Sequence, residues 1–281
     1  MAFHSKKQEY LNKAVEYFKK AAEVDEHHYP SYLGLAWSIL ERHHYSEIHE
    51  EDIIQAINLF NKVLEHLPNS ADAYSGLASA QKELGEHELA LGNAIKASQL
   101  RPYDVGYQAR VGFTYQQMAN YEVGNGDYLE AEKLYNLATP YFSKAVEINP
   151  KHFTGWLGLG WNSYFKGNFE EAETYFRNAI RVNPLYFNSY EGLGRVYYKL
   201  KNYEKSIVMY KKALELVPTE YIIHDGLGWS YLKNNDLSNA LNSFQNALTG
   251  HEEYPMSYFG IAYIYYKQTN LKASDAMIRR A

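Results

Sequence analysis

A 34-residue pattern recurs along almost the whole chain of 281 residues. Three consecutive copies of it contain a Gly-Leu-Gly triplet near their start, at residues 158–160, 192–194 and 226–228. Each copy then continues with a small residue, a large aromatic residue and an alanine at matching distances. One such unit is too short to bury its apolar face alone, so a fixed period of this length predicts a solenoid in which neighbouring units stack on one another.

The pattern can be registered as six complete units with a partial unit at each end. The complete units cover 29–70, 71–104, 105–152, 153–186, 187–220 and 221–254, and the partial units cover 1–28 and 255–281. We expect these units to form a single solenoid over residues 1–281, because the repeat overrides the two domains that this length would otherwise suggest.

Two groups of apolar or small residues recur in each unit, and both have helical spacing. The first group falls at positions 4, 7, 8 and 11 of the unit, and the second falls at positions 20, 24 and 27. Lys166-Gly-Asn168 separates the two groups in unit 153–186, and Pro184 closes the second one. Each unit is therefore predicted to be a pair of antiparallel helices, with small residues at positions 8 and 20 and a large residue at position 24 between them.

This spacing, together with a proline at position 32 in five units, resembles the tetratricopeptide repeat family over residues 7–281. The resemblance implies an all-α fold, a right-handed superhelical solenoid of antiparallel helix pairs. It also implies that the first helix of each unit lines a concave groove, with positions 2, 5, 9, 12 and 13 facing the groove.

Two units are longer than the repeat. Unit 29–70 has eight residues more than the period, and unit 105–152 has fourteen more. These numbers correspond to one and two extra turns on each helix of a pair. We therefore expect lengthened hairpins near 41–52 and 119–131 rather than disordered insertions, with Pro140 either kinking the return helix or restarting it after a Thr139 cap.

Aromatic residues gather at the positions that should face the groove. The residues expected to contact a partner are Trp37, Phe113, Trp161, Tyr164, Phe165, Arg195, Tyr198, Trp229, Tyr263 and Tyr266; we call this set the aromatic strip. Aromatic anchors beside a cation are typical of binding hot spots. Two alternatives stay open: the rings at position 9 are buried between units as core, or a segment of the same or a neighbouring chain fills the groove.

Two known recognition modes of the resembled family are not matched. Chaperone-binding members of the family hold a C-terminal carboxylate with lysine and with asparagine or arginine at positions 5 and 9 of successive units. The residue pairs at these positions here, such as Glu191 and Arg195, do not form that clamp. Position 6 is glycine in six of the seven units instead of the asparagine of the glycosyltransferase-linked superhelix. Glycine at this position lowers the groove floor, so a ligand could approach the backbone closely. Because glycine is also costly inside a helix, we expect either a packing or a binding reason for it.

The composition narrows the class of function. The net charge of −5 gives no basic field for nucleic acid, and no apolar run is long enough to span a membrane. No secretory signal follows Met1, so a cytoplasmic location is the simplest expectation. There is no cysteine, and the histidines near residues 27–49 are interpreted as a solvated hairpin, so we expect no metal, no cofactor and no catalytic residue.

We therefore predict a non-catalytic scaffold that binds a peptide segment of a protein partner in the aromatic groove. The alternatives are a scaffold for polysaccharide assembly or export, and the regulatory repeat region of a larger enzyme. The chain begins on a second helix and stops inside a repeat. It is accordingly interpreted as part of a longer protein, or as a chain that self-associates through its uncapped ends.

Overall fold

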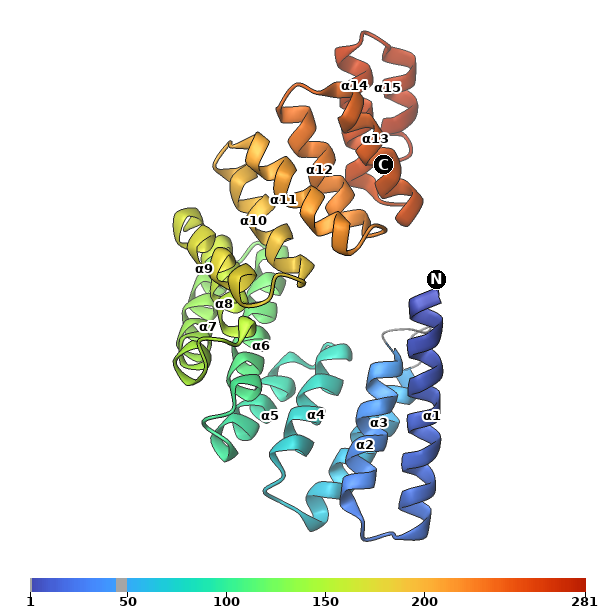
Figure 1. Ribbon diagram of the computed structural model, residues 1–281, viewed down its shortest axis with the longest axis vertical. Coiled ribbons are helices and arrows are strands. Elements are labelled where there is room, and N and C mark those ends of the chain that lie inside the picture. Colours follow the sequence, from blue (N-terminus) through green and yellow to red (C-terminus); the bar gives the residue numbers. More distant parts are fainter. Residues whose placement is uncertain (1, 44–49) are drawn as a thin grey trace. The chain divides into compact units, whose positions relative to one another are not determined.

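The computed structural model describes residues 2–43 and 50–281, and this part of the chain is all-α, with fifteen helices. Figure 1 labels them in chain order. The helices are α1 (Ala2–Val24), α2 (Tyr29–His43), α3 (Glu50–His66), α4 (Ala71–Glu83), α5 (His87–Leu100), α6 (Val105–Asn125), α7 (Tyr128–Ile148), α8 (Phe153–Phe165), α9 (Phe169–Val182), α10 (Phe187–Lys199), α11 (Tyr203–Leu216), α12 (Tyr221–Lys233), α13 (Leu237–Gly250), α14 (Pro255–Lys267) and α15 (Leu271–Ile278).

Contacts divide the chain into two compact units, Met1–Asn149 and Pro150–Ala281, which we call the N-terminal and C-terminal units. Within each of them, consecutive helices pack as hairpins, and each hairpin packs on the next one. The first helices of successive hairpins also touch, as α8 does with α10, α10 with α12, and α12 with α14. The all-α solenoid expected from the repeat is therefore confirmed.

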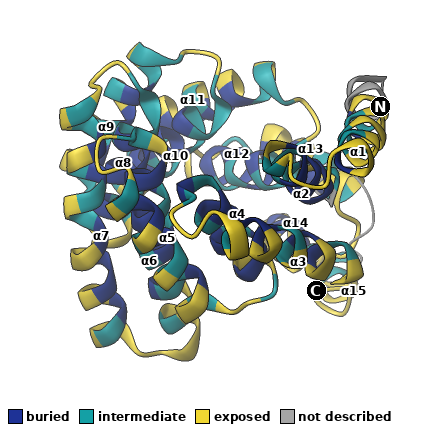
Figure 2. Ribbon diagram, turned by 90° about the horizontal axis from the view of Figure 1, so that it is seen from below, coloured by how far each residue is buried: buried dark blue, intermediate teal, exposed yellow. Residues whose placement is uncertain are grey.

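The buried core residues recur at the same positions in successive units. The residues at position 24, such as Phe60, Phe142, Phe176 and Phe244, have no exposed surface. The small residues at positions 8 and 20 are buried beside them, as at Ala36 and Ala56. Figure 2 shows the buried positions on the helix faces that meet neighbouring helices, with exposed positions on the outer faces and turns. Burial of these faces between hairpins is what stabilises units that would not fold alone.

Five of the position-6 glycines lie against a ring of the preceding repeat, which supports a packing reason for them over a low groove floor. A Cβ on Gly192 would lie 2.4 Å from the ring of Phe176, and one on Gly260 would lie 2.4 Å from the ring of Phe244. Gly76 has the same relation to Phe60, at 2.2 Å. The ring of one hairpin therefore occupies the space that a side chain on the next hairpin would need, so glycine is required for packing between repeats.

The lengthened hairpin at 119–131 consists of two regular helices. α6 and α7 have 21 residues each, whereas α4 has 13 and α5 has 14. Gly126 ends α6 with a φ of 83°, and the side chain of Asp127 accepts from Glu130 N at 3.0 Å to cap α7. Ala119, Ala131, Leu134 and Tyr135 form a buried cluster between the two helices. The hairpin thus has a small core of its own.

α7 is continuous across Pro140, so of the two alternatives for this proline, a kink or a restart after Thr139, the restart is wrong. The Thr139 hydroxyl donates to the Tyr135 carbonyl at 3.1 Å instead of capping a new helix. The tip of the other hairpin expected to be long, Tyr45–His49, lies outside the described residues. The helices on either side of it, α2 and α3, have 15 and 17 residues.

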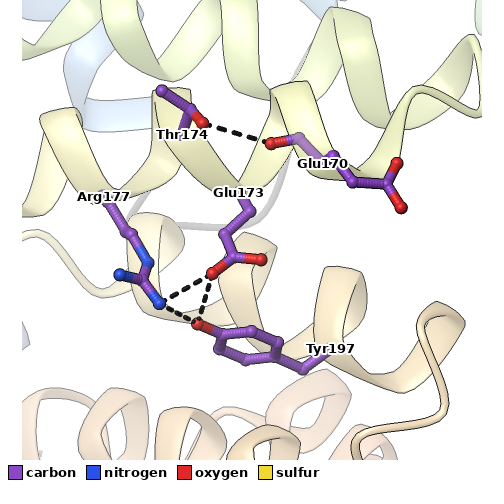
Figure 3. Close-up of polar contacts among 5 residues, drawn as sticks. All are labelled: Glu170, Glu173, Thr174, Arg177 and Tyr197. Atoms are coloured by element: carbon purple, nitrogen blue, oxygen red, sulfur yellow. Dashed lines mark hydrogen bonds and ion pairs between the residues drawn. The ribbon is translucent and has the colours of Figure 1, made fainter.

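A polar triangle joins two successive hairpins in the C-terminal unit (Figure 3). Arg177 of α9 pairs with Glu173 on the same helix at 2.7 Å and donates to the Tyr197 hydroxyl of α10 at 2.7 Å. The Tyr197 hydroxyl in turn donates to Glu173 at 2.9 Å. Burial raises the pKa of Tyr197. The triangle satisfies the hydroxyl of a buried ring at the junction between the hairpins.

Candidate binding surface

Most of the aromatic strip lies in the C-terminal unit, on the first helices of its four hairpins. These helices touch in the order α8, α10, α12, α14. The strip residues on them are Trp161, Tyr164, Phe165, Arg195, Tyr198, Trp229, Tyr263 and Tyr266. Helical spacing within each first helix and stacking between them bring these side chains together.

The two tryptophans of the strip in this unit have a mixed role. Trp161 meets the buried ring of Phe176 edge-on, with ring centroids 5.1 Å apart at an interplanar angle of 80°. Trp229 meets Phe244 in the same way, at 5.3 Å and 74°. Both tryptophans are half-buried. Each therefore packs on the core of its own hairpin with one edge and leaves part of its surface open.

The strip is most open at three rings near the ends of α8 and α14. Phe165 is 40% exposed, Tyr263 is 45% exposed and Tyr266 is 62% exposed. The Lys267 amine lies 5.6 Å from the centroid of the Tyr263 ring. Large rings held at such exposure on a helix face are available for contact with another molecule.

Arg195 is already paired within its own helix. Its Nε and Nη2 both contact Oε1 of Glu191, at 2.9 and 2.8 Å, and its guanidinium lies 5.8 Å from the centroid of the Trp161 ring. Burial raises the pKa of Glu191, and the charge of Arg195 opposes that rise. Glu191 therefore neutralises the cation of the strip, and the Trp161 ring lies beside its guanidinium.

Asp225 of α12 is a buried carboxylate that the sequence reasoning missed. It is 8% exposed and accepts a hydrogen bond from the Ser257 hydroxyl of α14 at 2.8 Å. Burial raises its pKa to about 6, against the opposing effects of Ser257, Trp229 and Arg195. Asp225 stands at position 5, which faces the groove in the resembled family, and that position was its only signal in the sequence.

Two cavities open along the strip and share Trp229. The first, of about 410 Å³, is lined by Tyr164, Arg195, Tyr198, Lys199, Tyr210, Ile222, Asp225, Gly226, Trp229, Tyr254 and Met256. The second, of about 600 Å³, is lined by Trp229, Leu232, Lys233, Asn235, Phe259, Ala262, Tyr263, Tyr266, Lys267, Ser274 and Ile278. We call them the inner cavity and the outer cavity.

The two cavities differ in charge. Glu191 and Asp225 accompany Arg195 and Lys199 at the inner cavity, so its charges largely cancel. The outer cavity is lined by Lys233 and Lys267 and by no carboxylate among the described residues, and its walls are mostly apolar. A bulky apolar side chain with a neighbouring carboxylate would match the outer cavity in both shape and charge.

The other two strip residues lie in the N-terminal unit. Trp37 meets Phe60 edge-on at 5.6 Å, and Phe113 meets Phe142 at 4.9 Å, which repeats the arrangement of the tryptophans above. Arg110 lies 5.7 Å from the centroid of the Trp37 ring and donates to the Ser79 hydroxyl. Burial lowers the pKa of Arg110. The sequence identified Trp37 and Phe113 but gave Arg110 no role.

Metal-binding and membrane-spanning features are absent from the described part of the chain. In residues 2–43 and 50–281, no group of three or more histidine, aspartate or glutamate side chains is arranged to hold a metal ion. Among the described helices, none is both long enough and apolar enough to cross a membrane.

Two family models match this chain. One tetratricopeptide repeat model matches residues 157–221 and 226–276, and a second tetratricopeptide repeat model matches residues 5–28. Among curated proteins, the "Small glutamine-rich tetratricopeptide repeat-containing protein 2" of Mycosarcoma maydis is 28% identical over 102 residues, which is 36% of this chain. The matched segment spans only 25% of that protein's length.

Solved structures share the fold at low sequence identity. A structure titled "Crystal structure of APC/C hetero-tetramer Cut9-Hcn1" covers 95% of this chain and 50% of its own, with a TM-score of 0.69 and 16% identity. TTC0263, a tetratricopeptide repeat protein of Thermus thermophilus, covers 73% of this chain and 99% of its own, with a TM-score of 0.60 and 20% identity.

Proposed function

Because this chain belongs to the tetratricopeptide repeat family, whose fold serves as a protein-interaction scaffold, we propose that it binds a peptide segment of a partner protein along the aromatic strip of its C-terminal unit. The observation that carries the proposal is the pair of adjoining cavities, which share Trp229 as a common wall. Two adjoining cavities of this kind suit two neighbouring side chains of one segment.

The outer cavity makes the main contact in this proposal. Phe259, Tyr263 and Tyr266 provide apolar surface for a bulky side chain of the partner, and Lys233 and Lys267 provide charge for a carboxylate beside it. The inner cavity contributes rings and a neutralised charge cluster, so it suits an uncharged polar or aromatic side chain. The scaffold acts by holding its partner, and we propose no catalytic role for it.

A selection experiment tests this function. Peptides displayed on phage would be selected on the wild-type chain and then measured on Tyr263→Ala/Tyr266→Ala. Tyr10→Ala/Tyr17→Ala provides a matched control, because it removes two exposed tyrosines from α1. Ring contacts at hot spots contribute about 2 kcal/mol or more, so we expect the affinity of the peptides for Tyr263→Ala/Tyr266→Ala to fall at least about tenfold. Their affinity for Tyr10→Ala/Tyr17→Ala should not change.

The selected sequences test the charge of the outer cavity separately. We expect them to share a bulky apolar residue beside an aspartate or glutamate, and to bind Lys233→Ala/Lys267→Ala more weakly. Peptides whose affinity is the same for wild type and Tyr263→Ala/Tyr266→Ala would contradict binding on the strip. Selected peptides that bind the strip but lack carboxylates would contradict only the assigned charge preference.

A further inference from the structure

A third cavity lies in the N-terminal unit, away from the strip. The turn between α4 and α5 rests against the last turns of α6 and leaves a space of about 590 Å³. Its walls are Gly85–Leu89 on one side and Met118, Tyr121 and Glu122 on the other. The extra length of α6 supplies the second wall, because a first helix of the usual 13 residues would end at about residue 117. We call this cavity the hairpin shelf.

The shelf presents apolar side chains to solvent. Leu89 is 57% exposed and Tyr121 is 58% exposed, although both lie within a folded helical hairpin. Met118 is half-buried and joins the shelf to the small core of the α6–α7 hairpin. His87 packs against Tyr121 with ring centroids 5.8 Å apart, and its buried Nδ1 has no hydrogen-bond partner in the described structure. Grouped apolar exposure of this kind marks contact surfaces.

The charges around the shelf all have one sign. Glu86, Glu88 and Glu122 line it, and no lysine or arginine of the described chain does. None of these three carboxylates forms an ion pair within the described residues. Lys82, four residues before Glu86 on the chain, pairs with Glu83 at 2.8 Å. A partner that placed positive charge here would meet three carboxylates that no cation of the described chain neutralises.

We propose that the hairpin shelf docks a basic amphipathic segment of a partner protein, with a bulky apolar side chain against Leu89 and Tyr121 and lysine or arginine beside the three glutamates. Charge complementarity selects this occupant over an acidic segment, which the same carboxylates would repel. The charge of the hairpin shelf is opposite in sign to that of the outer cavity, so the chain presents two docking sites that do not compete for the same ligand.

The test uses a fluorescein-labelled helical peptide made of leucine and lysine, measured by anisotropy with the full chain. Glu86→Gln/Glu88→Gln/Glu122→Gln should bind it at least about tenfold more weakly than wild type. Glu23→Gln/Glu65→Gln/Glu147→Gln loses the same three charges from exposed positions elsewhere in the unit, and should bind within about twofold of wild type. Leu89→Ser/Tyr121→Ser should also weaken binding about tenfold, which separates apolar docking from charge alone.

A charge reversal gives a second, positive readout. Measured in the Lys233→Ala/Lys267→Ala background, in which the outer cavity no longer offers charge to an acidic peptide, Glu86→Lys/Glu88→Lys/Glu122→Lys should lose the leucine–lysine peptide and gain affinity for a leucine–glutamate peptide. Circular dichroism would show that each variant keeps its helicity. The proposal is overturned by equal weakening in the two glutamine variants, by unchanged binding in Leu89→Ser/Tyr121→Ser, or by no saturable binding to wild type at about 1 mM peptide.

Discussion

At the scale of single residues, the position-6 glycines show how one hairpin constrains the next. From the sequence, packing and close approach of a ligand were both open as reasons for these glycines, because each helix was considered alone. The ring that fills the space above Gly192 comes from α9 of the preceding hairpin, and sequence spacing within one unit does not reveal it. The cost of glycine in a helix is therefore offset by packing between repeats.

Replacing Gly192 tests this packing. Gly192→Ala should lower the free energy of unfolding by about 1–3 kcal/mol, because the new methyl group would overlap the buried ring of Phe176. Gly92→Ala is the matched control, since a Cβ at that position would have no neighbour within 4 Å, and alanine there should stabilise the helix by about 0.5–1 kcal/mol. Urea unfolding of both variants is the measurement, and equal effects would contradict the packing role.

Asp225 predicts a pH dependence of stability. Its folded-state pKa of about 6 lies above the value of about 3.9 for an unfolded chain, so the folded state holds the proton more tightly. The contribution of Asp225 to the free energy of unfolding is therefore fully present below about pH 4, and it is lost as the pH rises through about 6. The difference in pKa corresponds to ~3 kcal/mol, since one pKa unit is about 1.36 kcal/mol.

Asp225→Asn removes this ionisable group, so the difference in stability between the variant and wild type should isolate its pH dependence. We expect the stability of Asp225→Asn relative to wild type to increase by ~3 kcal/mol between about pH 3 and pH 8, with most of the change between about pH 4 and pH 6. Denaturant unfolding across this range is the measurement. A difference that does not vary with pH would mean that Asp225 is ionised alike in the folded and unfolded states.

At the scale of elements, the turns inside the hairpins share one backbone conformation. The turn that follows the first helix contains a residue with a positive φ in several hairpins, 75° at Gly85 and 81° at Gly167 but also 60° at Thr269. Glycine adopts this conformation without strain, whereas a β-branched residue does not. The hairpin of α14 and α15 therefore contains a turn that is less favourable than those of its neighbours.

Exchange of these turn residues should change stability in opposite directions. Thr269→Gly should stabilise the chain by about 1 kcal/mol, because it places glycine at a position with a left-handed backbone conformation. Gly167→Thr should destabilise the chain by about 1–2 kcal/mol, because it places a β-branched residue at such a position. Thermal unfolding of the two variants beside wild type checks both signs. A fall in melting temperature for Thr269→Gly would contradict the argument.

Much of the element structure follows from the sequence, for a physical reason. Small residues at positions 8 and 20 and a ring at position 24 specify where two helices of a hairpin meet, and these contacts are local in the chain. Gly126 and Asp127 are end and start signals that can be read directly. The continuity of α7 across Pro140 could not be read in this way, because local rules allow either a kink or a restart at an internal proline. Ala138 and Phe142, on either side of Pro140, are fully buried.

At the scale of the whole molecule, stability should be distributed by neighbour contacts. Phe244 packs against Gly228 of its own hairpin and Gly260 of the next. Phe244→Ala should cost about 3–5 kcal/mol of local stability. We expect faster amide hydrogen exchange in α12–α15 than in wild type, with a smaller change in α8 and α9, because repeats couple mainly to their neighbours. Uniform acceleration across the C-terminal unit would contradict this.

The candidate site was predictable only in part. Aromatic residues such as Trp229 and Tyr266 were identified because their positions on the first helices follow from the period. The pairing of Arg195 with Glu191 is an ordinary i,i+4 contact within α10, which the spacing of the two residues already allowed. The buried Asp225 and the contribution of Phe259 depend on how successive hairpins pack, which one sequence does not specify. The charge difference between the two cavities emerged only from that packing.

The most direct test of the central claim is photocrosslinking from the strip itself. A benzophenone amino acid would replace Tyr266 in one chain and Tyr10 in another; both tyrosines are exposed, at 62% and 68%. After irradiation in lysate, mass spectrometry would identify the crosslinked peptides. The account predicts that position 266 captures a defined peptide segment of a partner and that position 10 does not. The same crosslinked segments from both positions, or none from 266, would contradict binding on the aromatic strip.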